Sequence, residues 1–353
     1  MKIKINKCSL SSKYNLKYKK KIRRTFKRKN IIRNNSYFIT HNRINHPYKK
    51  KNINKLKLQS SINFLDDIKY INGILRKLEK CKNNSELISI DHRELKNIDN
   101  SAILYLTAGL KLFSQNKMIR RSKIAPTSKS INNRLAEIGY WEALCCNPLK
   151  YDKNCDFLQI KKLENIEKIE HNDFHADIIN FFFEKHNLDV KYKDLLLDAI
   201  YEAFTNVVEH AFIKDEYKLE DKKAWFLGSY NKKSNELEFI FYDVGMGLFK
   251  SWALGRNRLA KILHRATKIL GKDGTLKNIC KESKSRHKDD KKRGKGLIAF
   301  KKFTDTISEK YPSYLEIVTE NKQYLTKSDR IHTLKDKIRG TFIRWVVEIK
   351  DEQ

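Results

Sequence analysis

Three polar residues share one face of an expected helix in the C-terminal half of the chain. Glu202, Asn206 and His210 follow one another at intervals of four residues within LLLDAIYEAFTNVVEHAF, so one helical face presents all three. The apolar residues between them form a wide stripe, which predicts a buried helix over about residues 192–212. Polar groups in so apolar a helix are costly to bury unless water, a metal or a ligand pairs with them. Taken alone, the pattern also fits the exposed face of an ordinary amphipathic helix.

A glycine turn further along the chain favours a ligand site. The run from Leu237 to Tyr242 predicts a strand, and it ends in Asp243, followed by Gly245 and Gly247 in a D-x-G-x-G pattern. A buried aspartate at a strand end can accept a hydrogen bond from an adenine amino group. Glycine lets the backbone approach the base closely. The same turn also closes plain hairpins, so its weight comes from the motifs around it.

A second glycine motif precedes an expected helix. Gly294, Gly296 and Leu297 stand in G-K-G-L, directly before an apolar helix-like run. Glycines at a helix N-terminus present bare N–H groups and a positive dipole end to phosphates. A strongly apolar strand is then predicted from Thr341 onward. An acid–amide pair on one helix face, followed by two separated glycine turns, is the layout of an ATP·Mg site. It is not of the Walker type, because no G-x-x-x-x-G-K-[S/T] occurs in the chain.

The order E-x-x-x-N, D-x-G-x-G, G-x-G-L, G-T resembles the GHKL superfamily of ATPases and kinases. This group includes sensor histidine kinases, gyrase B and heat-shock chaperone ATPases. The helix phrase that contains Glu202 and Asn206 is most similar to that of the anti-sigma-factor serine kinases. The resemblance covers about residues 173–353. It implies the Bergerat fold, an α/β sandwich in which a mixed sheet carries helices on one face and ATP lies between sheet and helices.

The resemblance implies a role for each matched residue. Asn206 would coordinate Mg²⁺, and Glu202 would be the general base that prepares a water or hydroxyl to attack the γ-phosphate. Asp243 would bind the adenine amino group, with Gly245 and Gly247 shaping that pocket.

The other matched residues complete this expected site. Gly294, Gly296 and Leu297 would cradle the phosphates at the end of the lid, and Thr341 would support the adenine side. His210 matches a position to which the resemblance assigns a structural role.

Residues 60–149 are expected to form a small α/β domain. The runs Ile90–Asp91, Ile98–Ala102 and Pro126–Tyr140 resemble the STAS domain of anti-sigma-factor antagonists, in which a partner kinase phosphorylates a serine. Ser101 matches that serine, but Asn100 stands in place of the neighbouring serine. The alternative role for Ser101 is that of a helix N-cap residue. The elements expected here are a helix over Ser60–Lys80, a strand over Glu86–Asp91, a helix from Asp99 to Phe113, a short strand at Lys123–Pro126 and a helix over Ser128–Leu144 interrupted at Gly139.

One further pattern concerns a histidine. His92 begins a sequence similar to the phosphoacceptor box of sensor histidine kinases, but the spacing is off by one and the proline is missing. No pair of long heptad helices surrounds it, as a dimerising phosphoacceptor domain would need. Histidine kinase activity therefore ranks below the other interpretations.

Positive charge is concentrated in two segments of the chain, whose formal net charge is +33. Residues 1–65 contain 20 Lys and Arg and no acid, and residues 249–293 contain 15 Lys and Arg against 4 acids, a net charge of +11. A basic arm free of acids is typical of contact with nucleic acid, and equally of a solvated tail. Aromatic residues within the arm would either stack on bases or dock on a protein.

These observations predict an α/β protein with an arm, two domains and a linker. Residues 1–59 form a basic, flexible arm, and residues 60–149 form the STAS-like domain with its leading helix. Residues 150–172 form a polar linker in which an edge strand or helix is an alternative. The ATP-binding domain spans residues 173–353 and includes a long basic lid at residues 248–293.

We expect a regulatory protein that binds ATP and Mg²⁺ and acts by serine/threonine-kinase-type phosphotransfer or by ATP-gated binding of a protein partner. The alternative is an ATP-hydrolysing conformational switch that acts on nucleic acid through residues 1–59 and the lid. A module that only holds ATP is a third interpretation, and Glu202 argues against it because such a module needs no general base.

Composition also predicts the compartment. No apolar run approaches the ~20 residues that span a bilayer, and the N-terminus lacks the apolar core of a secretory signal. The cysteines form no C-x-x-C spacing, which is typical of free thiols in a reducing compartment. We therefore expect a cytoplasmic protein without membrane contact.

Overall fold

The computed structural model describes residues 53–83, 87–114, 124–144, 156–163, 173–210, 223–250, 271–277 and 296–349. All of them belong to one compact unit that spans Asn52–Gln353. Most of the predicted arm and most of the predicted lid lie outside these described residues. None of the helices in the described segments is long and apolar enough to cross a membrane.

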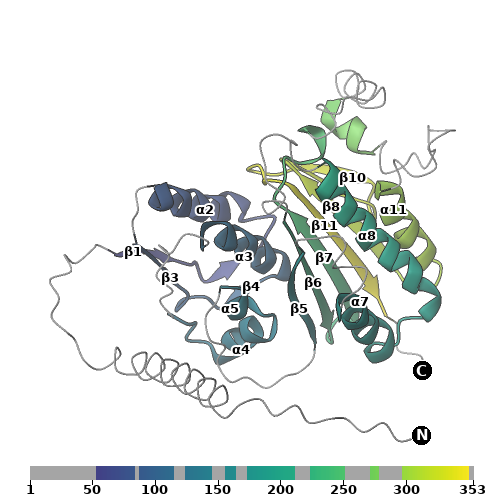
Figure 1. The fold of residues 1–353 in the computed structure, drawn as a ribbon, viewed down its shortest axis with the longest axis horizontal. Coiled ribbons are helices and arrows are strands. Elements are labelled where there is room, and N and C mark those ends of the chain that lie inside the picture. The colour runs from purple at the N-terminus through teal and green to yellow at the C-terminus, as the bar shows by residue number, and fades with distance from the viewer. Residues whose placement is uncertain are drawn as a thin grey trace, which may run out of the picture. The chain divides into compact units, whose positions relative to one another are not determined.

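An antiparallel sheet of seven strands forms the centre of this unit, in the order β10-β9-β8-β11-β7-β6-β5 (Figure 1). Every neighbouring pair in it is antiparallel. The mixed sheet that we predicted is therefore wrong, because short connections join β6 to β7, β8 to β9 and β9 to β10, and such hairpins impose antiparallel pairing. The strands are β5 (Phe157–Leu163), β6 (Ala224–Asn231), β7 (Glu236–Asp243), β8 (Ser313–Thr319), β9 (Lys322–Leu325), β10 (Arg330–Thr333) and β11 (Thr341–Glu348).

One face of the sheet packs against helices of the C-terminal half. Phe239 of β7 lies against Phe182, with ring centroids 4.0 Å apart, and against Phe303, at 6.0 Å. Figure 1 shows α8 and α11 side by side over this face. The elements on this side are α7 (Asp173–Ile178), η1 (Ile179–Lys185), η2 (Val190–Tyr192), α8 (Lys193–His210) and α11 (Gly296–Ile307).

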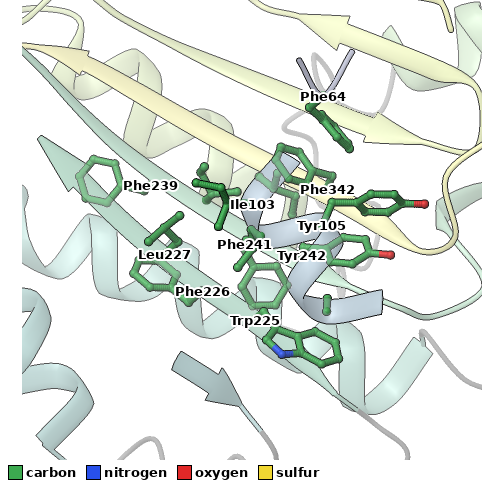
Figure 2. Close-up of a cluster of buried hydrophobic side chains, with 14 of the residues drawn as sticks. Phe64, Ile103, Tyr105, Trp225, Phe226, Leu227, Phe239, Phe241, Tyr242 and Phe342 are labelled. Carbon is green, nitrogen blue, oxygen red and sulfur yellow. The ribbon is translucent and has the colours of Figure 1, made fainter. Parts of the chain in front are cut away.

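The opposite face of the sheet is covered by the N-terminal segment. Tyr105 on α3 (Asn100–Ser114) stacks edge-on against Tyr242 of β7, with centroids 5.0 Å apart, and Phe64 stacks on Phe342 of β11 at 4.5 Å (Figure 2). Helix α2 (Ile68–Asn83) packs on α3. The resemblance implied helices on one face, whereas both faces carry them. The reason is that the central strands have buried side chains at both odd and even positions, as in β6, and both faces must then be covered.

The remaining N-terminal elements only partly match the predicted ones. A helix was predicted from Ser60, but β2 (Ser61–Ile62) and a turn come first, so α2 begins at Ile68. β1 (Ile53–Lys57) pairs in parallel with β3 (Leu87–Asp91), so chain that we assigned to the arm belongs to the compact unit. The predicted strand at residues 123–126 is a single bridge between Asp91 and Ile124.

The helix predicted over Ser128–Leu144 is confirmed together with its interruption. It consists of α4 (Lys129–Glu137) and α5 (Tyr140–Ala143), and the Ser128 side chain caps α4. Gly139 between them has φ +83°, a left-handed conformation that costs glycine little and breaks a helix.

The cap of α3 and the strand within the predicted linker can be compared with the predictions. The carboxylate of Asp99 accepts the Ala102 N–H at 2.6 Å, so Asp99 caps α3 and the N-cap role suggested for Ser101 is wrong. β4 (Asn97–Ile98) precedes this cap and pairs with β2. Within the predicted linker, residues 156–163 include β5, the edge strand that we gave as an alternative.

Candidate functional site

The carboxylate of Asp243 is the buried centre of the site. It lies at the end of β7, where the residue is 5% exposed. The N–H of Gly245 donates to Asp243 Oδ1 at 2.7 Å, and both the hydroxyl and the N–H of Thr341 donate to the carboxylate. Burial outweighs these donors and raises the pKa of Asp243 to about 7, because a buried charge loses its hydration.

The antiparallel register brings the ends of three strands together here. Thr341, at the start of β11, pairs with Asp243 on one side and with Thr319, at the end of β8, on the other. The hydroxyl of Thr319 accepts the Leu248 N–H at 3.0 Å, which holds the chain after the D-x-G-x-G turn. Sequence reasoning missed Thr319, because nothing in a strand-ending threonine indicates which turn it will contact.

Two glycines allow the turns at this site to approach one another. Gly247 has φ +83°, and a Cβ there would lie 3.1 Å from Thr319 Oγ1 and 3.2 Å from the carbonyl of Gly340. Gly340 also has φ +83°, and a Cβ there would lie 1.9 Å from the backbone oxygen of Asp243. Real Cβ atoms do not approach that closely, so Gly340 has to be glycine. The sequence indicated Gly340 only as the glycine of the G-T motif, directly before a predicted strand.

The structure places Glu202 and Asn206 one turn apart on α8, and both are half-buried. Their buried neighbours on the helix are Ala203, Phe204 and Val207. The side chain of Asp243 points to the same face of the sheet as that of Phe239, because the residues of a strand alternate between faces. That is the face over which α8 and α11 lie (Figure 1). Glu202 and Asn206 thus belong to a helix that lies over the sheet face toward which Asp243 points.

The remaining predicted residues are placed only in part. Gly296 is the first residue of α11, Leu297 follows it, and His210 is the last residue of α8. Gly294 lies outside the described residues. In short, the structure brings Asp243, Gly245, Gly247 and Thr341 together, and it does not join Glu202, Asn206 or the G-K-G-L residues to them by a described contact.

A short helix at residues 271–277 is the part of the predicted lid that the structure describes beyond residue 250. Ion pairs connect it to the β8–β9 hairpin and the turn that follows β9. Lys272 contacts the carboxylate of Glu320 and also lies 5.4 Å from the ring centroid of Phe249. Asp273 accepts from Lys322 at 2.7 Å. Six basic residues of the predicted lid are candidates for contact with the γ-phosphate, and all of them lie outside the described residues (Arg256, Arg258, Arg286, Lys291, Lys292 and Arg293).

Among the described residues, no group of three or more His, Cys, Asp or Glu side chains could hold a metal ion. Mg²⁺ needs fewer protein ligands than that, because it keeps several waters and binds through one or two carboxylate or amide oxygens together with phosphates. Asn206 and Glu202 are one turn apart on α8 and are of this chemical type.

His92 has an environment that differs from that of a phosphoacceptor. It is 2% exposed. Its Nδ1 donates to the carbonyl of Ile124 at 3.1 Å, so Nε2 of the neutral ring accepts from the hydroxyl of Tyr140, 2.8 Å away. Burial lowers the pKa of His92 to about 4. These contacts make His92 a neutral core residue that joins β3 to α5.

A buried ionic network lies on the face that α3 covers. The guanidinium of Arg344 contacts the carboxylates of Glu238 and Glu316. Asn100, at the start of α3, donates to Glu238 Oε2 at 2.6 Å and to Ser229 Oγ at 2.9 Å. Burial by itself would raise the pKa of Glu238, but Arg344 and these hydrogen bonds lower it below its ordinary value. The network therefore holds the N-terminal segment on the sheet.

Fold and site together define an α/β protein with an antiparallel sheet covered on both faces and a buried, readily protonated carboxylate at its strand ends. A scan against protein-family models, a search of curated proteins and a search of solved structures each found no match.

Proposed function

We propose that this protein binds ATP and Mg²⁺ in a GHKL-type site and uses the nucleotide to regulate a partner, by phosphotransfer to serine or threonine or by ATP-gated binding. The observation that carries the proposal is the carboxylate of Asp243. It is buried, costly to ionise and held beside two left-handed glycines at the strand ends. A purely structural aspartate that raises its own pKa to about 7 destabilises the fold, and such groups cluster at functional sites.

The adenine end of ATP matches the chemistry of this carboxylate. Three protein donors occupy part of its acceptor capacity, and the exocyclic amino group of adenine would supply the next donor. Gly247 and Gly340 let the turns around the carboxylate pack closely against one another, which would hold it in a fixed position for a bound base. Recognition by a hydrogen-bond acceptor rejects purines that carry a carbonyl there, because two acceptors would face each other.

The phosphate end would be bound by residues of α8 and α11. Asn206 would contribute an amide oxygen to Mg²⁺, which neutralises phosphate charge when bound. Glu202 would accept the proton of the attacking hydroxyl or water. The N-terminus of α11, with Gly296 as its first residue, would contribute backbone N–H groups of the kind that bind phosphate. The proposal also includes a Bergerat-type arrangement of residues 173–353 and a STAS-like fold for residues 60–149.

The test separates binding, transfer and hydrolysis. Purified full-length protein is titrated with ATP and with GTP by calorimetry in Mg²⁺ buffer, and we expect ATP binding with at least about tenfold preference over GTP. Incubation with γ-labelled ATP should then label the protein or an added partner on serine or threonine. Equal affinity for both nucleotides, or no binding of either, would refute the proposed site.

The role of Glu202 has a matched control on the same helix. Glu202→Ala should lower transfer or hydrolysis by roughly 10²–10⁴-fold, the usual contribution of a general base, while ATP binding stays nearly unchanged. Asp198→Ala removes an exposed acid one turn earlier on α8 and should leave both properties unchanged. If Glu202→Ala keeps full activity, the base has been assigned wrongly.

The acid-free basic arm favours the second candidate, an ATP-hydrolysing switch on nucleic acid. Under that candidate the protein releases free phosphate faster when DNA or RNA is added, and binding falls steeply with salt. Deleting residues 1–51, which lie outside the compact unit, should abolish that stimulation. Labelled serine with no response to nucleic acid decides for the first candidate.

A further inference from the structure

The loop over residues 334–340 connects β10 to β11 and delivers Gly340 and Thr341 to the Asp243 site. Its position is tightly restricted at that end, since a Cβ on Gly340 would lie 1.9 Å from the Asp243 carbonyl oxygen. The Ile338 N–H donates to the carbonyl of Glu320 at 2.8 Å. Whatever holds this loop therefore also sets the geometry of the candidate adenine pocket.

A buried amide on α2 holds the middle of the loop. Asn72 is 6% exposed. Its Nδ2 donates to the carbonyl of Lys337 at 2.8 Å and to Asp336 Oδ2 at 3.2 Å. Arg76, one turn later on α2, forms an ion pair with the same Asp336 carboxylate. Helix α2 thus contacts the loop through two residues that are one turn apart, at a sequence separation of more than 250 residues.

The same amide is connected to the loop by a second route. Asn72 Oδ1 accepts from the hydroxyl of Tyr105 at 2.7 Å. The ring of Tyr105 packs against Tyr242, and Figure 2 shows the two hydroxyls on the same side. The Tyr242 hydroxyl donates to the carbonyl of Arg339 at 2.8 Å. Tyr242 immediately precedes Asp243, so this route ends beside the site.

We propose that the N-terminal helices position the 334–340 loop, which makes Asn72 a positioning residue for the Asp243 site. Both donor hydrogens of the amide and its acceptor oxygen are engaged. Removal of the amide leaves the carbonyl of Lys337 and the hydroxyl of Tyr105 without these partners. Because Gly340 has no free space around it, displacement of the loop changes the approach to the Asp243 carboxylate.

This arrangement couples α2 to nucleotide binding, which rests on the proposed function. Coupling between two sites is reciprocal. A change that pulls α2 away from the loop lowers the affinity for ATP, and bound ATP in turn holds α2 on the loop. The N-terminal segment then regulates the site from the opposite face of the sheet, without contact with the nucleotide.

A second buried amide provides the matched control. Asn100 also joins the N-terminal segment to the sheet, through Ser229 and Glu238. Glu238 precedes Asp243 by five residues on the same strand, a distance of about 17 Å at 3.4 Å per residue. Asn72→Leu and Asn100→Leu remove the same chemical group at the two ends of one interface, so both should lower thermal stability.

The experiment uses the full-length protein and two measurements. Hydrogen exchange of peptides that cover residues 334–345 should be faster in Asn72→Leu than in Asn100→Leu, in the absence of nucleotide. The dissociation constant for ATP should rise roughly tenfold in Asn72→Leu, within the usual range of coupling between sites, and less than about twofold in Asn100→Leu. Asp336→Ala, on the loop itself, should raise the dissociation constant for ATP by a smaller factor. It serves as the second variant if Asn72→Leu does not fold.

The outcomes separate the two proposals. Equal exchange of residues 334–345 in the wild type, Asn72→Leu and Asp336→Ala overturns the positioning role, whether or not ATP binds. Equal loss of ATP affinity in Asn72→Leu and Asn100→Leu also overturns it, because the effect is then one of global stability. If the wild type binds no ATP but the loop exchange differs as expected, the positioning role holds and the proposed nucleotide site fails.

Discussion

Asp243→Asn is the substitution that most directly tests the candidate site, because it should improve stability and impair binding together. Asparagine has nearly the same shape as aspartate but never ionises. At this position the carboxylate is buried, and its burial raises the pKa of Asp243 from 3.8 to about 7. The folded protein therefore resists the ionisation that the unfolded chain allows.

The sign and magnitude follow from that difference in pKa. A carboxyl whose pKa is higher in the folded state costs no stability below pH 4, where it is protonated in both states. As the pH rises from 4 to 7, the unfolded chain loses this proton first and the folded state becomes less stable. The shift of about 3 units corresponds to about 4 kcal/mol at 1.36 kcal/mol per unit. Asp243→Asn should recover up to that amount above pH 7 and almost none near pH 4.

Urea unfolding at pH 5 and pH 8 measures this gain, with a control on the same strand. Glu238 has its pKa lowered, because Arg344 and hydrogen bonds outweigh its burial. Glu238→Gln should therefore destabilise the protein at pH 8, the opposite sign. The difference between Asp243→Asn and wild type should increase from pH 5 to pH 8.

The Asp243→Asn variant should bind ATP at least about tenfold more weakly than the wild type, which is the effect of losing a hydrogen bond to a charged group. Asparagine has one carbonyl oxygen for the donors of Gly245 and Thr341, and its NH₂ group then opposes either Thr341 or the adenine amino group. A stability difference that does not depend on pH would refute the assigned burial of a charge. Unaltered ATP affinity would refute the pocket.

Two other substitutions test the geometry around the site and in the core. Gly340→Ala should destabilise the protein by at least about 2 kcal/mol, because of the left-handed φ at this position and the clash with Asp243. Gly73→Ala, which has open space around it in α2, should leave the stability unchanged or raise it by about 0.5–1 kcal/mol. Equal effects of the two substitutions in thermal unfolding would contradict this. Burial lowers the pKa of His92 from 6.5 to about 4, so the wild type should lose up to about 3 kcal/mol of folding stability as the pH falls from 6.5 to 4. His92→Gln should remove that pH-dependent loss. Identical pH dependence of stability in the two proteins, measured by denaturant unfolding, would disprove it.

Much of the local structure could be predicted from the sequence, because the signals were strong and short-range. The apolar periodicity around Glu202 and Asn206 predicted α8 to within about two residues at either end. The largely apolar run from Leu237 to Tyr242 predicted β7 and its last residue, Asp243. Gly139 correctly marked a break between two helices, because the chain there has a positive φ, which glycine adopts readily.

The clustering at the site was predictable only in part. The D-x-G-x-G motif kept Asp243, Gly245 and Gly247 together because they are neighbours in the chain. Thr341 was included through the resemblance; the structure pairs it with Asp243, and its role at an adenine remains a prediction. Thr319 carried no local signal, and its contact with the Leu248 N–H exists only because β8 lies beside β11.

By itself, then, the sequence determined the helices and strands that carry the candidate residues, because residue propensity and hydrophobic period act over a few neighbours. Tertiary structure alone decided the antiparallel order of the sheet, the covering of its second face by α3, and the contact of Asn72 with the loop before Gly340. Those features depend on pairs of residues far apart in the chain. Such pairs are selected by the packing of the whole core and have no signature in either partner's local sequence.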